Sequence, residues 1–317
     1  MNIVYLGSGW FGIESLNALY GSDHDLRLVV TQPPNPAGRG RKPRPTPVAC
    51  WADRHGIPFI ETGNVNVSEV IEQIVNYQPD LIVVIAFGQK VGNELVDLSP
   101  KGTINVHSSL LPKYRGAAPI NWTIINGEAK TGLSIITLAE RMDAGHILAQ
   151  EQTDIAPDET AGQLHDRLAK MAGPLLLKTI NRIADGTAVY TEQNHAEATF
   201  APKLRKSNGV LDFSEPAKVL ARKVRGFWPW PGASANYVSK KNNKFVRVTL
   251  AGAEVVESSN PANLPAGTLD EDLNVICGEN ALKIIQIKPA GSALMAFKDF
   301  TNGRQTQPGD SFVEIGN

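Results

Sequence analysis

Two short segments of this chain carry residue types that suit acyl transfer. Asn105 and His107 end the segment 103–107, and their spacing of two places both side chains on one face of a strand. Asp143 lies in residues 141–146, a predicted turn between two apolar strands. An amide can donate to an oxyanion, an imidazole can move a proton, and a carboxylate can orient the imidazole. The residues therefore predict an acyl-transfer site if the fold brings the two segments together.

Two other chemistries would use neighbouring residues. His107, Asp143 and His146 are acceptable zinc ligands, although Asp143 and His146 lie three apart in a glycine turn and no HExxH-like helix supports them. Ser108 or Ser109 could act as a nucleophile, although neither lies in a GxSxG elbow. Both alternatives stay open at this point, and the metal-free acyl-transfer site is the favoured interpretation.

A glycine motif near the start of the chain suggests a further alternative. Residues 7–12, Gly-Ser-Gly-Trp-Phe-Gly, match GxGxxG between a predicted strand and a predicted helix. The dinucleotide fingerprint also needs an acidic residue about 20 positions on, and residues 29–34 hold no carboxylate. We therefore interpret the glycines as a tight turn for helix packing, with an NAD-dependent oxidoreductase as a weaker alternative.

The elements that must position these residues alternate along the first half of the chain. Apolar runs predict strands and periodic segments predict helices, and this alternation is typical of a doubly wound, Rossmann-like parallel sheet. Ligands of such sheets bind at the carboxyl ends of the strands. The expected strands are 3–6, 26–30, 81–85, 131–138 and 147–155, and the expected helices are 11–20, 48–55, 68–77 and 159–184. Thr46 and Pro47 are the expected N-cap and first residue of the second helix.

The pattern changes after about residue 187. One helix, 216–227, is followed by short strands broken by Gly, Pro and Asn, which is typical of a small β-barrel. We expect a catalytic domain at 1–189, a linker at 190–207 and a smaller, OB-like barrel domain at 208–317.

The net charge of −1 is unevenly distributed. Residues 203–247 carry 11 basic side chains against Asp212 and Glu215, a net charge of +9. Charge clustered on one module indicates a polyanion partner such as a nucleic acid, and the alternative is a solvated lysine-rich face.

Composition narrows the class of protein. Of 317 residues, 42% are hydrophobic and 20% charged, which excludes disordered, collagenous and coiled-coil chains. No apolar run reaches the ~18 residues of a membrane span. Cys50 and Cys277 are isolated, and the chain starts directly with a predicted strand rather than a signal sequence. We expect a cytoplasmic protein that does not bind membranes.

Residues 105–120 contain the string Asn-x-His-x-Ser-Leu-Leu-Pro-x-Tyr-Arg-Gly-Ala-Ala-Pro-Ile. This string, with Asp143 in its later loop, resembles the folate-dependent formyltransferases. The segments 36–42, 228–233 and 289–291 resemble the basic loop, the barrel start and a late barrel turn of those members that act on tRNA.

The resemblance implies roles for individual residues. Asn105, His107 and Asp143 match the catalytic trio, and the co-substrate would be 10-formyltetrahydrofolate, with neither metal nor NAD. The acceptor would be the α-amino group of methionyl-tRNA, and we expect a monomer. The implied folate-binding residues are Val84, Ile85, Ala86, Phe87, Gly88, Ser109, Leu110, Leu111 and Pro112. The implied tRNA-binding residues are Arg39, Arg41, Lys42, Arg44, Lys203, Arg205 and Lys206.

Some features differ from the family pattern or leave the acceptor open. The family commonly has Gly-Thr-Pro where this chain has residues 7–9, and Gly or Ala where it has Ser108. The alternative acceptor is a nucleotide-linked amino sugar, which has no use for the four basic residues of segment 36–44. A tRNA-binding module without activity is a third reading. The glycines and prolines of segment 36–44 predict an exposed loop without regular secondary structure.

Overall fold

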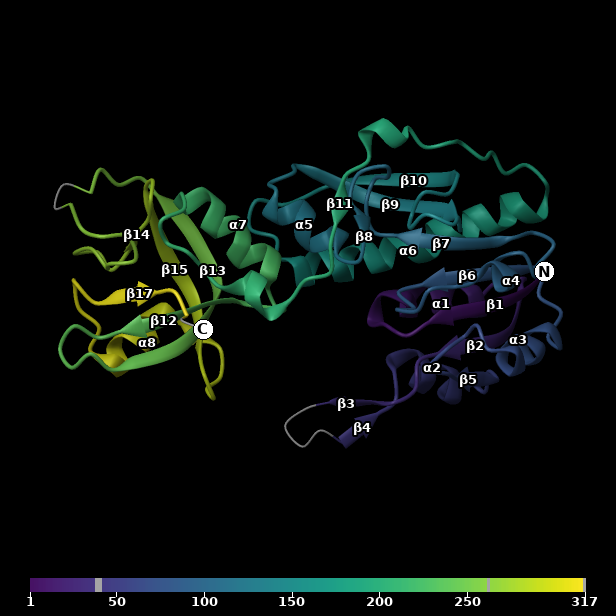
Figure 1. Cartoon of the computed structure of the whole chain (residues 1–317), viewed down its shortest axis with the longest axis horizontal. Coiled ribbons are helices and arrows are strands. Elements are labelled where there is room, and N and C mark those ends of the chain that lie inside the picture. The colour runs from purple at the N-terminus through teal and green to yellow at the C-terminus, as the bar shows by residue number, and fades with distance from the viewer. Residues whose placement is uncertain (38–41, 261–262, 316–317) are drawn as a thin grey trace. The chain divides into compact units, whose positions relative to one another are not determined.

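The structure is a computed structural model, and it describes residues 1–37, 42–260 and 263–315 (Figure 1). The chain divides into two compact units, which are interleaved in sequence. Unit 1 comprises Met1–Gly116, Lys130–Asp154 and His165–Ala201, and unit 2 comprises Ala117–Ala129, Ile155–Leu164 and Pro202–Asn317.

Unit 1 is built on a seven-stranded sheet with the order β10-β9-β7-β6-β1-β2-β5. Strands β5, β2, β1, β6 and β7 are parallel, which confirms the Rossmann-like fold, whereas β9 runs antiparallel to both β7 and β10. The strands are β1 Asn2–Gly7, β2 Asp25–Thr31, β5 Phe59–Glu61, β6 Leu81–Ile85, β7 Thr103–His107, β9 Lys130–Thr137 and β10 Ile147–Asp154.

Helices connect the parallel strands of unit 1. They are α1 Ile13–Tyr20, α2 Pro47–His55, α3 Ser68–Val75 and α4 Asn93–Val96, and the long α6 Ala161–Ala184 follows β10. As expected, Thr46 caps α2, because its hydroxyl accepts from the Ala49 N–H at 3.0 Å, and Pro47 is the first helical residue. No helix in the described part of the chain is long and apolar enough to cross a membrane.

The glycines of segment 7–12 make room for Tyr5. A Cβ on Gly12 would lie 1.8 Å from the Tyr5 hydroxyl, and one on Gly7 would lie 2.5 Å from Cε1 of the same ring. The Tyr5 side chain is fully buried beneath this turn, and burial raises the pKa of its hydroxyl. This close packing supports the structural interpretation of the glycine motif.

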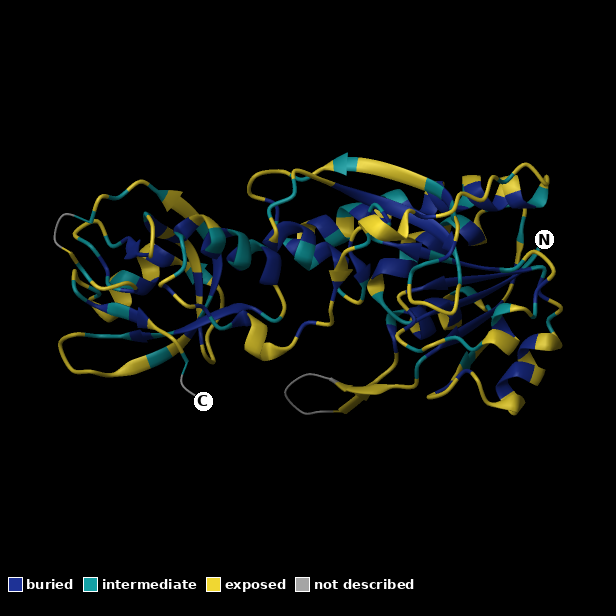
Figure 2. Ribbon diagram, turned by 45° about the horizontal axis from the view of Figure 1, so that its top comes forward, coloured by how far each residue is buried: buried dark blue, intermediate teal, exposed yellow. Residues whose placement is uncertain are grey.

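The basic segment has more structure than its composition indicated. Strands β3 Asn35–Ala37 and β4 Lys42–Arg44 form an antiparallel hairpin stem in which Asn35 faces Arg44 and Ala37 faces Lys42. The prediction of no regular element is therefore wrong for the stem. Pro36 and Pro43 oppose each other, at a pair position where the ladder needs no N–H donor. Residues 35–36 and 42–44 of the stem are exposed, as Figure 2 shows in yellow, and Arg39 and Arg41 lie outside the described residues.

Unit 2 contains a nearly closed antiparallel barrel, as predicted. Its sheet has the order β14-β15-β13-β12-β17, and residues 267–269 bridge the outer strands β14 and β17 through pairs with Val275 and Ser311. The strands are β12 Ala233–Val238, β13 Phe245–Val256, β14 Val275–Ile276, β15 Ala281–Pro289, β16 Met295–Ala296 and β17 Ser311–Val313. Helices α5 Pro119–Ile125, α7 Ala217–Phe227 and α8 Phe297–Arg304 complete the unit.

The barrel core is aromatic and aliphatic. Tyr237, Phe300 and Phe312 pack together with ring centroids between 5.1 and 5.5 Å from Tyr237, and they are at most 2% exposed. Burying rings of this size supplies a large part of the hydrophobic stabilisation of a small barrel.

Candidate active site

Strand β7 places Asn105 and His107 at the carboxyl end of the parallel strands. Asn105 pairs with Val84 of β6 and Ile136 of β9, so it lies between two strands of the sheet. Val106 points to the opposite face and is 4% exposed. The period of two that the sequence indicated is therefore present, and it presents the amide and the imidazole on the same face.

A backbone carbonyl fixes the ring of His107. The His107 side chain is buried, and its Nε2 donates to the carbonyl oxygen of Tyr114 at 2.9 Å. A carbonyl only accepts, so Nε2 carries a proton. The other ring nitrogen, Nδ1, faces Oδ2 of Asp143 at 3.6 Å. That separation exceeds the range of a direct hydrogen bond, so Nδ1 remains available to a substrate.

The loop between β9 and β10 carries Asp143. This residue has a φ of 52°, the left-handed region that is uncommon for a side chain other than glycine. The N–H of Gly116 donates to Asp143 Oδ2 at 2.8 Å. The structure thus brings Asp143 next to His107, as the site prediction requires, and a backbone donor fixes the position of its carboxylate.

Two buried residues that the sequence analysis missed support this loop. The Gln193 amide nitrogen donates to the main-chain oxygens of Asp143 at 2.9 Å and Gly145 at 2.7 Å. Its oxygen accepts from Arg115 Nη2 at 2.6 Å, and Arg115 also contacts Nδ1 of His195. Burial lowers the pKa of the Arg115 guanidinium, and the Asp143 charge opposes that shift. Gln193 lies 50 positions from Asp143, too far for any spacing rule to connect them.

The turn after β6 contains the expected folate-lining residues. Val84 and Ile85 are buried in the strand, and Ala86 and Gly88 have φ values of 47° and 80°. Phe87 is buried, and its carbonyl accepts from the side chains of Ser8 at 3.2 Å and Gln32 at 2.8 Å. Ser8, where this chain departs from the family pattern, therefore holds the turn in place.

Ser109 stabilises the turn that follows β7. Its hydroxyl donates to the Lys113 carbonyl at 2.7 Å, and its side chain is almost completely buried. The hydroxyl of Ser134 joins this turn by donating to Ser109 O and accepting from Leu111 N. Ser109 thus has a structural contact, which disfavours a nucleophile. Leu110 is half-buried, Leu111 is buried, and a cis peptide bond joins Leu111 to Pro112.

The metal alternative gains no support from the described ranges. Within residues 1–37, 42–260 and 263–315, no group of three His, Cys, Asp or Glu side chains could hold a metal ion. His146 is exposed, whereas His107 is buried.

The basic residues of the tRNA hypothesis are at the surface where they are described. Lys42 and Arg44 lie on the exposed hairpin stem of unit 1. In unit 2, Lys203, Arg205 and Lys206 are exposed around the buried Leu204, and a short 3-10 helix begins at Lys206. Leu204 packs with Ile125 and Phe227 and so anchors this basic segment to unit 2.

The Asn-His-Asp cluster at the carboxyl edge of the α/β sheet suits group transfer, and comparisons with known proteins show the family. The family model "Formyl transferase" matches residues 1–180, and "Formyl transferase, C-terminal domain" matches residues 203–305. The chain therefore belongs to the formyl transferase family. Within this family it falls among the methionyl-tRNA formyltransferases: the enzyme of that name from Citrifermentans bemidjiense is 39% identical over 98% of this chain and 95% of its own length.

Solved structures agree with the fold. Methionyl-tRNA formyltransferase from Clostridium thermocellum has a TM-score of 0.56 and 16% identity, covering 81% of this chain and 94% of its own. WlaRD, a sugar 3N-formyl transferase crystallised with dTDP and 5-N-formyl-THF, has a TM-score of 0.64 and 15% identity, covering 92% and 99%. The two family models and the 39% identical relative confirm the family resemblance inferred from residues 105–120.

Proposed function

We propose that this chain transfers the formyl group of 10-formyltetrahydrofolate to the α-amino group of methionyl-tRNA, giving formylmethionyl-tRNA for translation initiation. The observation that carries the proposal is the pair of the buried His107 and the half-buried Asp143, 3.6 Å apart, beside Asn105 in a chain 39% identical to an enzyme of that name. We expect it to act as a monomer in the cytoplasm.

The turn after β6 suits the folate co-substrate, which supplies the formyl group on N10. Among the described residues, the backbone N–H groups of Phe87 and Gly88 have no hydrogen-bond partner. Ser8 and Gln32 hold the Phe87 carbonyl, so the turn presents these donors in a fixed geometry. Fixed backbone donors beside an apolar strand end can recognise the polar edge of a pterin ring.

Asn105 and His107 would stabilise the charge that develops during transfer. When the neutral amine attacks the formyl carbon, the carbonyl electron pair moves to oxygen. The Asn105 amide is half-buried and has no partner in the described part of the chain, so its N–H can donate to that oxygen. The proton on Nε2 of His107 is used in the hydrogen bond to the Tyr114 carbonyl. Nδ1 can therefore donate to the formyl oxygen only when the ring is the doubly protonated imidazolium.

Asp143 would stabilise the protonated His107 and accept the proton of the attacking amine. Its carboxylate stabilises the imidazolium of His107, and it can accept the proton that the attacking nitrogen loses, directly or through a water. As the bond from the formyl carbon to N10 breaks, N10 takes a proton, so the transfer is neutral overall. The main-chain contacts of Gly116 and Gln193 keep the carboxylate in position.

Basic residues would bind the tRNA through its phosphates. Lys42 and Arg44 on the hairpin stem, Arg39 and Arg41 between its strands, and Lys203, Arg205 and Lys206 in unit 2 are the proposed contacts. Lys and Arg neutralise phosphates and position the nucleic acid without reading its sequence.

The test is transfer of labelled formyl groups from 10-formyltetrahydrofolate to three acceptors: methionyl-tRNA, free methionine and a UDP-linked amino sugar. We expect kcat/KM to be highest for methionyl-tRNA by several orders of magnitude. A faster reaction with the amino sugar would identify the alternative acceptor, and no transfer to any of the three would contradict a formyltransferase.

A further inference from the structure

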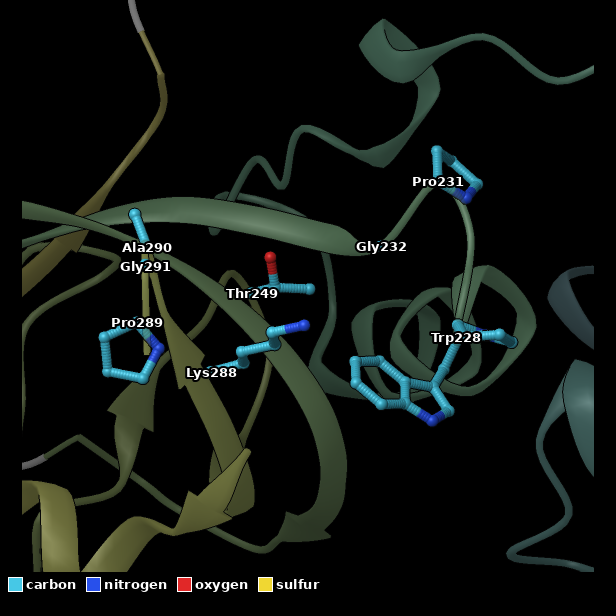
Figure 3. Close-up of a pocket in the computed structure, with 9 residues that line it drawn as sticks. Trp228, Pro231, Gly232, Thr249, Lys288, Pro289, Ala290 and Gly291 are labelled. Atoms are coloured by element: carbon cyan, nitrogen blue, oxygen red, sulfur yellow. The ribbon is translucent and has the colours of Figure 1, made fainter. Parts of the chain in front are cut away.

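The barrel of unit 2 carries a hollow of about 290 Å³ on its surface (Figure 3). Its lining comes from three segments: the residues after α7, including Trp228, Pro229 and Pro231; Thr249 of β13; and residues 288–291 at the end of β15. None of these residues belongs to the active site described above. The hollow combines apolar walls with two polar side chains, Thr249 and Lys288.

The strand register explains why Thr249 and Lys288 face the hollow together. The two residues oppose each other in the antiparallel β13–β15 pair. Val248 and Leu250 are buried on either side of Thr249, and Ile287 and Pro289 are buried on either side of Lys288. The alternation therefore turns both side chains outward. In Figure 3 the Lys288 side chain lies below Thr249, and its end points toward the side on which the Trp228 indole is drawn.

No described residue competes with a ligand for the Lys288 ammonium. Among the described residues, neither this ammonium nor the Thr249 hydroxyl has a hydrogen bond or an ion pair. The exposed Arg247, two residues from Thr249 on β13, adds positive charge at this end of the ladder. At the other end of the same ladder Glu254 opposes Lys283, so the charge there is balanced. The end with the hollow is thus the one that attracts an anion.

The dimensions and the lining indicate the class of ligand. A volume of about 290 Å³ is at the lower limit of small-molecule sites and suits one ring system. An indole and prolines offer flat apolar surfaces to a base, and a lysine with a hydroxyl offers donors to a phosphate or ribose. A base in a duplex has both faces covered by its neighbours, so only an unpaired base can use such walls.

We propose that this hollow binds one unpaired nucleotide of an RNA, with the base against Trp228 and the backbone at Lys288. The inference rests on the proposed function, in which that RNA is the tRNA substrate. Binding of this nucleotide would fix one point of the RNA on unit 2. Contacts to phosphates alone would let the RNA shift along the surface, because every phosphate is alike.

Two pairs of variants test the hollow against matched controls. Lys288→Met removes the charge in the hollow, and Lys283→Met removes an exposed lysine from the other end of the same strand. Trp228→Leu removes the indole wall, and Trp230→Leu removes an indole that is 51% exposed and outside the hollow. Binding of methionyl-tRNA is measured for each at several salt concentrations, with a thermal melt to verify folding.

We expect Lys288→Met to reduce the slope of log K against log salt by ~0.7, the contribution of one phosphate of a single strand. Trp228→Leu should weaken binding about fivefold or more, as expected for a lost base–aromatic stack. Both controls should match the wild type. Equal behaviour of the two lysine variants and of the two tryptophan variants would overturn the proposal.

Cross-linking tests the unpaired state directly. Ultraviolet irradiation of the wild-type complex with methionyl-tRNA, followed by peptide mapping, should join an unpaired nucleotide to the peptide containing Trp228 or Lys288. A cross-link there from a base-paired stem would contradict the inference. Failure of the proposed function would appear differently, as absent formyl transfer by the wild-type protein.

Discussion

The side-chain amide of Gln193 holds the backbone of Asp143 in its left-handed conformation. It donates to the Asp143 carbonyl at 2.9 Å and to the Gly145 carbonyl at 2.7 Å, and Arg115 holds the other end of the same amide. A non-glycine residue at a φ of 52° costs of order 1 kcal/mol and needs support from its surroundings. We therefore propose that Gln193 is a positioning residue, which keeps the Asp143 carboxylate directed at His107.

Replacing Gln193 should misplace that carboxylate. For Gln193→Leu, which keeps the volume but loses all the hydrogen bonds, we expect kcat to fall by ~10- to 100-fold, the effect of a displacement near 1 Å. The KM values for folate and for tRNA should change little, because the residue lies on neither proposed binding surface. Steady-state kinetics with each substrate varied in turn measures this split.

Gln73→Leu on the exposed face of α3 is the matched control and should retain wild-type kinetics. If Gln193→Leu changed only thermal stability, with kcat unaltered, the residue would have no positioning role.

Removing the proton acceptor at Asp143 should also lower kcat. An Asn side chain keeps the shape of Asp and its oxygen can still accept from the Gly116 N–H, but a neutral amide cannot act as the proton acceptor. We expect Asp143→Asn to lower kcat by ~10² or more. Asp97→Asn, at an exposed position after α4, is the control. Substantial activity in Asp143→Asn would mean that the carboxylate only orients His107.

Basic residues of the hairpin should contribute salt-dependent tRNA binding. Arg39→Ala and Lys42→Ala should each weaken binding of different tRNA sequences alike and reduce the salt slope by ~1. Affinity for folate should not change. Arg54→Ala, at the exposed end of α2, is the comparison in the same unit. If Arg39→Ala kept wild-type kinetics with methionyl-tRNA at both low and high salt, Arg39 would not contact the tRNA, and its charge would serve solubility alone.

The barrel should lose stability in alkaline solution. Burial, together with the hydrogen bond to Asp310, raises the pKa of Tyr237 from 10 to about 12. The folded state thus favours the neutral phenol, and its contribution is complete below pH 10 and declines as the pH rises toward 12. Urea unfolding followed by circular dichroism should give a lower free energy of unfolding at pH 11 than at pH 9.

Tyr237→Phe cannot ionise at this position, so its free energy of unfolding should depend less on pH over the same interval. An identical pH dependence in wild type and variant would assign the alkaline loss to other groups.

Local signals in the sequence predicted a large part of the fold and of the site. The cap Thr46-Pro47 depends on neighbouring residues, and Asn105 and His107 follow from the period of a single strand. Because neighbouring residues determine these features, the local sequence pattern is enough to predict them. Asp143 was found through its turn and the family string, and the structure places it beside His107.

Features that depend on distant segments could not be read in this way. The support of Asp143 by Gln193 joins residues 50 positions apart, and the reversed direction of β9 follows from its pairing with β7. The sequence does not predict the hairpin stem because prolines such as Pro36 and Pro43 argue against a strand. In the structure the two prolines pair with each other, so the ladder lacks no N–H donor at that position. In each case the pairing partner, rather than the local sequence, determines the outcome.

Single-turnover formyl transfer to methionyl-tRNA by Asn105→Ala and His107→Ala tests the central claim most directly. Under saturating folate and tRNA the experiment isolates the chemical step from binding. If both side chains stabilise the developing oxyanion, the rate constant should fall by ~10² or more in each variant, while folate affinity remains close to that of the wild type. A near wild-type rate constant in either variant would contradict the role assigned to that residue.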